Sequence, residues 1–206
     1  MKKQFLILTA CLSSLALVYT SCKEEETPAT PPTTTATTAT TATTGNTQQT
    51  LYVRVGGTTM VSDPSNPGQM IEKGRLTLRA VVDSSINVIA ADTQLQKYFV
   101  ALFAELRTGN TTGLAALSES FTDFMCSATG STNAAYAYTG RSMKNAHDPA
   151  VFSRMALKAN AADFDKFVGN IGIGLAKNGV TAQNNAALVT DLVALLNTTK
   201  NDIVQR

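Results

Sequence analysis

The chain has 206 residues and a formal net charge of +2, with 16% charged residues against about 25% in an average soluble domain. This length holds one ordinary domain plus appendages. A near-neutral balance, without a basic patch interleaved with aromatic residues, argues against nucleic acid as a partner. The three cysteines, Cys11, Cys22 and Cys126, make neither a disulfide framework nor a CxxC metal knuckle. With one histidine in the chain, an all-protein zinc site would depend on carboxylates.

The first 22 residues resemble a bacterial lipoprotein signal peptide. Two lysines precede an apolar run over residues 5–19, which is shorter than the ~20 residues of a transmembrane helix. Thr20-Ser21 before Cys22 resembles a lipoprotein cleavage site, although Tyr19 replaces the usual aliphatic residue. We therefore expect Cys22 to be lipidated and to anchor the chain to a membrane. The alternative is an ordinary cleaved signal peptide with an incidental cysteine.

Residues 23–50 are expected to form a disordered tether. The acidic run Glu24–Glu26 resembles the export tag of surface-exposed lipoproteins in some Gram-negative bacteria. The rest of the segment is almost entirely threonine and alanine with three prolines, so it has no large apolar side chain whose burial would offset the entropy of ordering. We expect a folded domain over residues 51–206 to be held at the outer membrane, facing the cell surface or the periplasm.

The domain from residue 51 onward shows helical periodicity and no convincing strand. Residues 51–55 form a short apolar segment, followed by two glycines and a loop rich in proline and glycine. Apolar residues then recur at spacings of three and four over 78–90, 114–125, 164–175 and 188–203. Helix ends are expected near Gly130 and Gly179, and Thr181 is a suitable N-terminal cap. The pattern predicts an all-α domain.

His147 is the only histidine, and it lies four residues after Met143. In a helix this spacing places the two residues one turn apart on the same face. The ring Nδ1–H of His147 could then donate to the Met143 carbonyl, which would fix the tautomer and leave Nε2 free to bind a metal. A lone histidine is more often a surface or core residue, so this contact needs support from the rest of the chain.

The order of several short motifs resembles truncated haemoglobins of group I, over nearly all of residues 51–204. The motifs are Leu51–Gly57, Ala80–Asp83, Ala90–Asp92, Leu95 with Tyr98-Phe99, Ala128–Gly130, Tyr138–Gly140 with Met143 and His147, Phe164-Asp165, Gly179-Val180 and the final leucine-rich helix. The resemblance implies a two-over-two sandwich of helices around haem b, a shortened relative of the larger globin fold. Loops after Gly57 and after Gly130 are longer than in the compact family pattern.

The resemblance also assigns candidate site residues. It makes His147 the proximal ligand of the haem iron, and it places Phe99 against the porphyrin. The remaining candidates for the haem pocket are Tyr138, Met143, Ile86, Leu117, Phe121, Phe124 and Met125. Amphipathic spacing alone predicts that the apolar members of this set are ordinary core residues. Arg141 and Lys144 either pair with haem propionates or are solvated, and Cys126 is expected to be buried and inert.

The departures from the family pattern concern the distal side. Family members that hold oxygen tightly usually have a tyrosine where this chain has Ile86, and commonly a glutamine where it has Leu117 or Phe121. Such donors contribute about 1–3 kcal/mol to a charge-assisted hydrogen bond in a dry pocket. Here Ser85 and Ser120 would be the nearest hydroxyls if the register shifted by one residue. An apolar distal side predicts fast ligand escape, unsuppressed autoxidation and a preference for carbon monoxide or nitric oxide over oxygen.

Three functions follow from these observations. The first is a haem-binding carrier or sensor of a diatomic gas (oxygen, nitric oxide or carbon monoxide), tethered at the cell envelope. The second is a nitric oxide dioxygenase or a peroxidase-like haem enzyme, which needs a redox partner that the sequence does not identify. The third is a haem scavenger or a haem-free interaction module. The glycine trio Gly169, Gly172 and Gly174 lies within a helical pattern, which favours close helix packing over a phosphate-binding loop.

Overall fold

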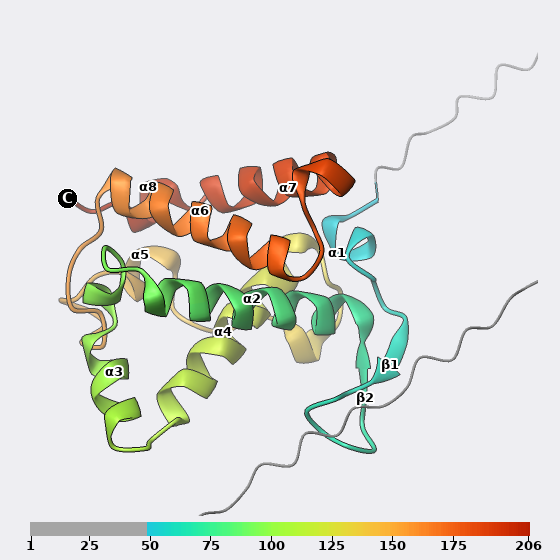
Figure 1. Ribbon diagram of the computed structural model, residues 1–206, viewed down its shortest axis with the longest axis horizontal. Helices are drawn as coiled ribbons and strands as arrows, with labels where there is room; N and C mark the ends of the chain where they lie inside the picture. Colours follow the sequence, from blue (N-terminus) through green and yellow to red (C-terminus); the bar gives the residue numbers. More distant parts are fainter. Residues whose placement is uncertain (1–48) are drawn as a thin grey trace, which may run out of the picture. The chain divides into compact units, whose positions relative to one another are not determined.

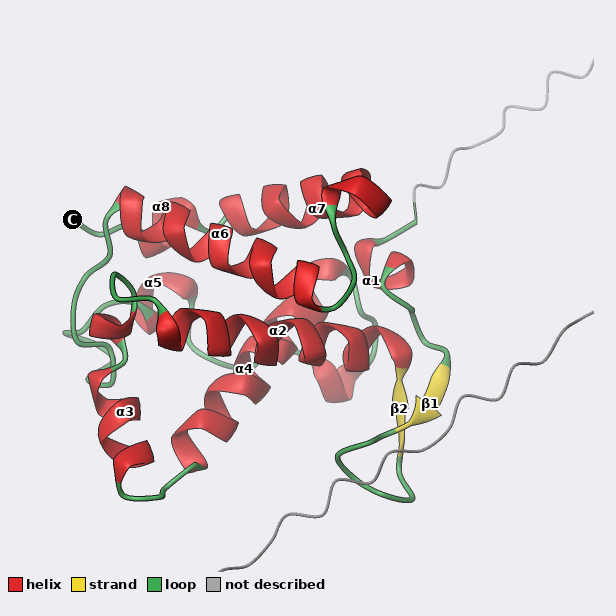
Figure 2. Cartoon of the chain, viewed as in Figure 1, coloured by secondary structure: helices red, strands yellow, loops and turns green. Residues whose placement is uncertain are grey.

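The computed structural model describes residues 49–206, which form a helical domain (Figure 1). The expected signal peptide (1–22), the lipidation expected at Cys22 and nearly all of the expected tether (23–50) lie outside the described residues. Figure 2 shows that helices dominate the described part and that a single small hairpin interrupts them. The long helices are α2 (Lys73–Ala91), α4 (Thr112–Thr129), α6 (Ala161–Lys177) and α7 (Ala182–Asn197). The shorter elements are α1 (Leu51–Arg54), β1 (Met60–Ser62), β2 (Met70–Glu72), the 3-10 turn η1 (Gln96–Tyr98), α3 (Val100–Arg107), the 3-10 turn η2 (Ala134–Tyr136), α5 (Met143–Ala146) and α8 (Lys200–Ile203).

The four long helices form two pairs. Helix α2 packs on α4, α6 packs on α7, and the pairs meet where α2 runs beside α6 (Figure 1). A first core cluster between the pairs includes Leu78, Val82, Met125 and Leu192. A second core cluster joins the end of α2 to η1, the start of α6 and α8; its buried residues are Ile89, Leu95, Tyr98, Ala159, Phe164 and Ile203. None of the helices between residues 49 and 206 is long and apolar enough to cross a bilayer.

The predicted helix ends are present and have clear local causes. Helix α4 ends at Gly130, whose φ of +97° is favourable for glycine. Helix α7 begins with a capping box in which the Thr181 hydroxyl accepts from the Asn184 N–H and the Asn184 side chain accepts from the Thr181 N–H. Helix α6 has a second capping box, formed by Asn160 and Asp163. These caps satisfy backbone donors that a helix start otherwise leaves unpaired.

The prediction that the domain contains no strand is wrong at one place. Strands β1 and β2 form an antiparallel two-stranded hairpin, with Val61 opposite Ile71. Each strand has three residues, and Met60 and Met70 are about half exposed, so the sequence has no alternation long enough to mark a strand. The hairpin occupies the expected loop after Gly57, and its turn contains the proline and glycine residues that signalled that loop.

Helix α2 approaches α6 closely at Ser85 and Gly174. A Cβ atom on Gly174 would lie 3.1 Å from the Ser85 Cα and nearer still to its hydroxyl, so alanine at this position would force the helices apart. Nothing lies within 4 Å of a Cβ built on Gly169 or Gly172. The interpretation of the glycine trio as close helix packing therefore holds for Gly174 alone.

We expect Gly174→Ala to lower the free energy of unfolding by about 1–3 kcal/mol, the usual cost of overpacking a core. Gly169→Ala and Gly172→Ala are matched controls on the same helix. Each should raise the free energy of unfolding by about 0.5–1 kcal/mol, because glycine is a poor helix former. Urea unfolding, compared through the transition midpoint at unchanged slope, measures all three. If Gly174→Ala left the free energy of unfolding unchanged, the contact between α2 and α6 would have room for a methyl group.

Candidate functional site

His147 follows the single turn of α5, at the C-terminal cap of that helix. Its Nδ1 lies 2.8 Å from the Met143 carbonyl oxygen, so the contact expected from the spacing is present. The carbonyl can only accept, so the proton resides on Nδ1. The ring Nε2 has no hydrogen-bond partner within the described part of the chain. His147 thus presents one nitrogen with an unused lone pair.

Burial favours the neutral form of the His147 ring. The ring is half-buried, and desolvation lowers its pKa below the ordinary value of 6.5; this effect outweighs the bond to the Met143 carbonyl, which raises it. A metal binds the neutral imidazole and competes with the proton for the same nitrogen. A lowered pKa therefore favours metal ligation at neutral pH.

Tyr138 connects the segment that leads into α5 to helix α4. Its backbone N–H donates to the Ser127 hydroxyl at 2.7 Å, and its phenol donates to the Arg141 carbonyl at 2.7 Å. Its ring also meets the Phe124 ring edge-on, with centroids 5.9 Å apart. These contacts fix the position of the chain shortly before His147 relative to α4. Tyr138 thus has a structural task whether or not it touches a cofactor.

Helix α4 has a half-buried apolar face. Leu117, Phe121 and Phe124 share one side of the helix by their spacing, and all three are half-buried, whereas Met125 is only 2% exposed. The Phe121 ring lies 6.0 Å from that of Phe167 on α6. Large apolar side chains left half-buried in this way offer contact surface to an apolar group.

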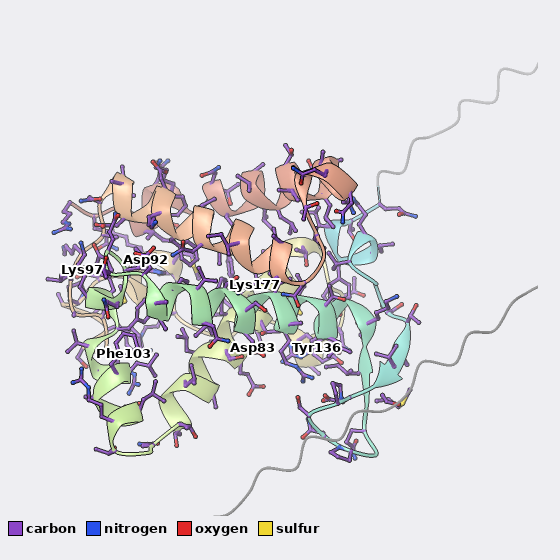
Figure 3. The ribbon with its side chains drawn as sticks, viewed as in Figure 1. Asp83, Asp92, Lys97, Phe103, Tyr136 and Lys177 are labelled. Carbon is purple, nitrogen blue, oxygen red and sulfur yellow. The ribbon has the colours of Figure 1, made fainter. Side chains whose placement is uncertain are left out.

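The remaining predicted pocket residues lie in two places. Ile86 and Phe121 pack against the first core cluster, which contains Met125, while Phe99 and Met143 pack against the second. Phe167 and the adjacent Val168 contact both clusters, so these residues of α6 lie between the two groups of candidates. The end of α2 and the turn η1, where Asp92 and Lys97 are labelled, lie together in Figure 3. The structure therefore brings Phe99 and Met143 to one cluster and leaves Ile86 and Met125 in the other.

Neither serine that was considered as a distal hydroxyl serves that role. The Ser85 side chain is fully buried against α6, and its hydroxyl donates to the Val81 carbonyl at 2.7 Å. Ser120 is exposed on α4. Ser85 lies in the contact between α2 and α6, because the helix register places it on the packed face of α2. The sequence alone did not show which face of α2 would pack against α6.

Thr122 on α4 has a buried hydroxyl that sequence reasoning missed. The residue is 1% exposed, and its Oγ1 has no hydrogen-bond partner, alone among the buried side-chain oxygens and nitrogens of residues 49–206. Helix geometry turns it about 100° away from Phe121, toward the same side as Cys126 and Thr129. Its hydroxyl therefore belongs to the buried face of α4 and not to the face that carries Leu117.

We expect Thr122→Val to raise the free energy of unfolding by about 1 kcal/mol, because it removes an unsatisfied buried hydroxyl while keeping the side-chain shape. Thermal and urea unfolding measure the change. Thr129→Val is the matched control on the same helix: its hydroxyl donates to the Met125 carbonyl at 2.6 Å, so that variant should be destabilised. Equal losses in both variants would mean that Thr122 has a partner such as an ordered water.

The possible metal ligands of the site suit the metal of a bound cofactor better than a bare metal ion. In the part of the chain that the structure describes, no group of three or more histidine, cysteine, aspartate or glutamate side chains could hold a bare metal ion. One imidazole with a free ring nitrogen and a half-buried apolar helix face are instead groups that fit a haem, whose iron a histidine can hold. Cys126 is not a competing ligand, since burial raises the pKa of its thiol to about 11. It is fully buried, as expected.

Comparison with solved structures identifies the fold as that of the truncated, two-over-two haemoglobins. A truncated haemoglobin from Tetrahymena pyriformis, solved as a tyrosine-to-phenylalanine variant in the Fe(III) form, is similar with a TM-score of 0.51 and 19% identity; the match covers 77% of this chain and 100% of the other. The 2/2 haemoglobin from Synechococcus sp., solved in the cyanomet state with covalently attached haem, gives 0.52 and 21%, with the same coverage.

No protein-family model matches the sequence, and a search of curated proteins also finds no match. The prediction of an all-α, two-over-two globin fold is thus confirmed by the solved structures, with the small hairpin as an addition. The assignment to group I of the family stays a prediction.

Proposed function

We propose that this protein is a haem-binding globin in which His147 would hold the iron. The observation that carries the proposal is the half-buried imidazole whose Nδ1 donates to the Met143 carbonyl while its Nε2 has no partner among residues 49–206. The truncated globin fold around it supports the proposal, because the solved neighbours are haemoglobins. When bound, haem b supplies an iron with a coordination position for a diatomic gas.

Several residues of the chain would orient the haem, enclose it and neutralise its propionates. The Met143 carbonyl holds the proton on Nδ1, so Nε2 presents its lone pair. Phe99 and the half-buried face of Leu117, Phe121 and Phe124 provide apolar contact. Arg141 is exposed with its guanidinium 4.5 Å from the Phe152 ring, and Lys144 is also exposed, so both cations are available to haem propionates.

An apolar distal side determines which gas is favoured. Ile86, Leu117 and Phe121 carry no hydrogen-bond donor, and Ser85 is turned away into the α2–α6 contact. A side-chain donor there would favour oxygen over carbon monoxide, because hydrogen bonds are strongest to a group that carries negative charge. We propose fast oxygen escape and a preference for carbon monoxide or nitric oxide, in a carrier or sensor rather than an enzyme. The proposed lipid anchor at Cys22 would keep this domain at the outer membrane.

Titration of the untagged protein with haem tests the proposal. We expect one haem per chain with a sharp Soret band, and His147→Ala should weaken haem binding by at least the 10–100-fold that loss of a mere supporting residue costs at a metal site. Lys177→Ala, at the far end of α6, is the control and should bind normally. Equal, weak binding by all three proteins would contradict the proposal. Rapid transfer of haem to an acceptor would favour the scavenger, and nitrate production beyond that of free haem would favour the dioxygenase.

A further inference from the structure

Helix α5 is too short to hold its own geometry. It has four residues, Met143–Ala146, and an isolated single turn is unstable in water. The Ser142 side chain caps its start by accepting from the Asn145 N–H at 3.3 Å. The position of His147 must therefore depend on contacts from outside the helix.

Those contacts come from the segment Val204–Arg206, which follows α8. The Gln205 side-chain amide donates to the Lys144 carbonyl at 2.8 Å and to the Asp202 carbonyl at 3.0 Å. The Lys144 carbonyl also accepts the backbone N–H of His147 at 3.3 Å. One carbonyl of α5 thus receives a bond from His147 and a bond from Gln205, and it belongs to the residue next to Met143.

The same segment is itself held at several points. Val204 pairs with Ala159 in a parallel bridge, and the Gln205 N–H donates to the Ala159 carbonyl at 2.9 Å. The Arg206 guanidinium donates to Asp163 at 3.0 Å and to the Tyr98 phenol at 3.3 Å. Val204 also packs on the second core cluster together with Met143. A segment tied to α6 and η1 in this way can fix whatever its Gln205 side chain binds.

We propose that Gln205 is a positioning residue for the His147 imidazole. Its side-chain N–H donates to the Lys144 carbonyl, which keeps the single turn of α5 closed. The closed turn keeps the adjacent Met143 carbonyl in place to accept from Nδ1–H of His147. This inference rests on the proposed function in one respect: the imidazole needs a fixed position because it is proposed to hold the haem iron. The arrangement itself concerns the apo-protein and can be tested without haem.

The test is the tautomer of His147 in the haem-free protein, measured by nitrogen NMR at pH 8, where the ring is neutral. Because the chain has one histidine, the signal needs no assignment. The wild type should show the Nδ1–H tautomer. Gln205→Ala should shift the population toward the Nε2–H tautomer, which free imidazole side chains prefer in water, and should speed amide exchange of His147 about fivefold, the effect of one lost hydrogen bond.

Three further variants separate positioning from general stability. Gln205→Glu keeps the size but cannot donate, so it should behave like Gln205→Ala, whereas Gln205→Arg restores a donor and should restore the Nδ1–H tautomer. Asn201→Ala, exposed on α8, should change nothing. An unchanged tautomer and exchange rate in Gln205→Ala would overturn the inference, as would Nε2–H in the wild type. A protein that passes this test yet fails to take up haem would refute the proposed function and leave the inference standing.

Discussion

Replacing Asp163 with alanine is expected to lower the free energy of unfolding by about 2–4 kcal/mol. The residue is 3% exposed and accepts hydrogen bonds from the side chains of Tyr98, Gln94 and Arg206. It also completes the capping box of α6 with Asn160. Loss of the cap costs about 1 kcal/mol, and leaving the buried Tyr98 phenol without its acceptor costs about 1–3 kcal/mol more.

Urea unfolding measures this loss, and Asp165→Ala is the control. Asp165 is two residues away on the same helix and forms an ion pair with Lys200, but its side chain is 62% exposed. Exposed ion pairs contribute about 0–1 kcal/mol, so the control should be nearly as stable as the wild type. Similar losses in the two variants would mean that the Asp163 cluster does not hold η1 to α6.

The Asp163 carboxylate also makes the free energy of unfolding depend on pH in the acid range. Burial alone would raise the pKa of Asp163, but the hydrogen bonds from Tyr98, Gln94 and Arg206 lower it well below the ordinary range. A folded-state pKa below the unfolded value of about 3.9 adds stability that is complete above that value and disappears as the pH falls toward the folded pKa. Below about pH 5, stability should therefore fall less steeply in Asp163→Asn than in the wild type.

Leu117→Gln is expected to slow oxygen dissociation from the haem-loaded protein about 5- to 150-fold. The substitution places an amide donor on the half-buried face of α4, and a hydrogen bond of about 1–3 kcal/mol to a partly charged ligand corresponds to that range. Carbon monoxide dissociation should change much less. Flash photolysis and stopped-flow mixing measure both rates.

Ala116→Gln is the matched control for this variant. Ala116 is the preceding residue of α4 and is exposed, so the same amide points away from Leu117. Its oxygen rate should equal that of the wild type. If Leu117→Gln had no effect while haem bound normally, the face of Leu117, Phe121 and Phe124 would not be the distal side.

Local patterns were enough to predict the four long helices and the contact of His147 with Met143. Apolar spacing marks α2, α4, α6 and α7, Thr181 marks a cap, and the Met143–His147 spacing anticipates the 2.8 Å contact. Each of these features depends on residues within one or two turns of each other. The order of motifs also pointed to the fold, although each motif is short.

Features that depend on distant parts of the chain were not predictable. Asp163 meets Tyr98 and Arg206 across 65 and 43 residues, and Gln205 meets Lys144 across 61, so no local pattern announces them. The strands of the hairpin are too short to show alternation. Helix α3 was not predicted because it is short: its eight residues bury only Leu102 and show no clear apolar face.

A resonance Raman spectrum of the untagged, haem-loaded protein in its reduced, ligand-free form tests most directly whether His147 holds the iron. We predict an iron–histidine stretching band, and because the chain has a single histidine, that band would identify His147 as the ligand. His147→Ala should lose the band, and added imidazole should restore one. A haem-loaded wild type without the band, or a band that survives in His147→Ala, would contradict the account.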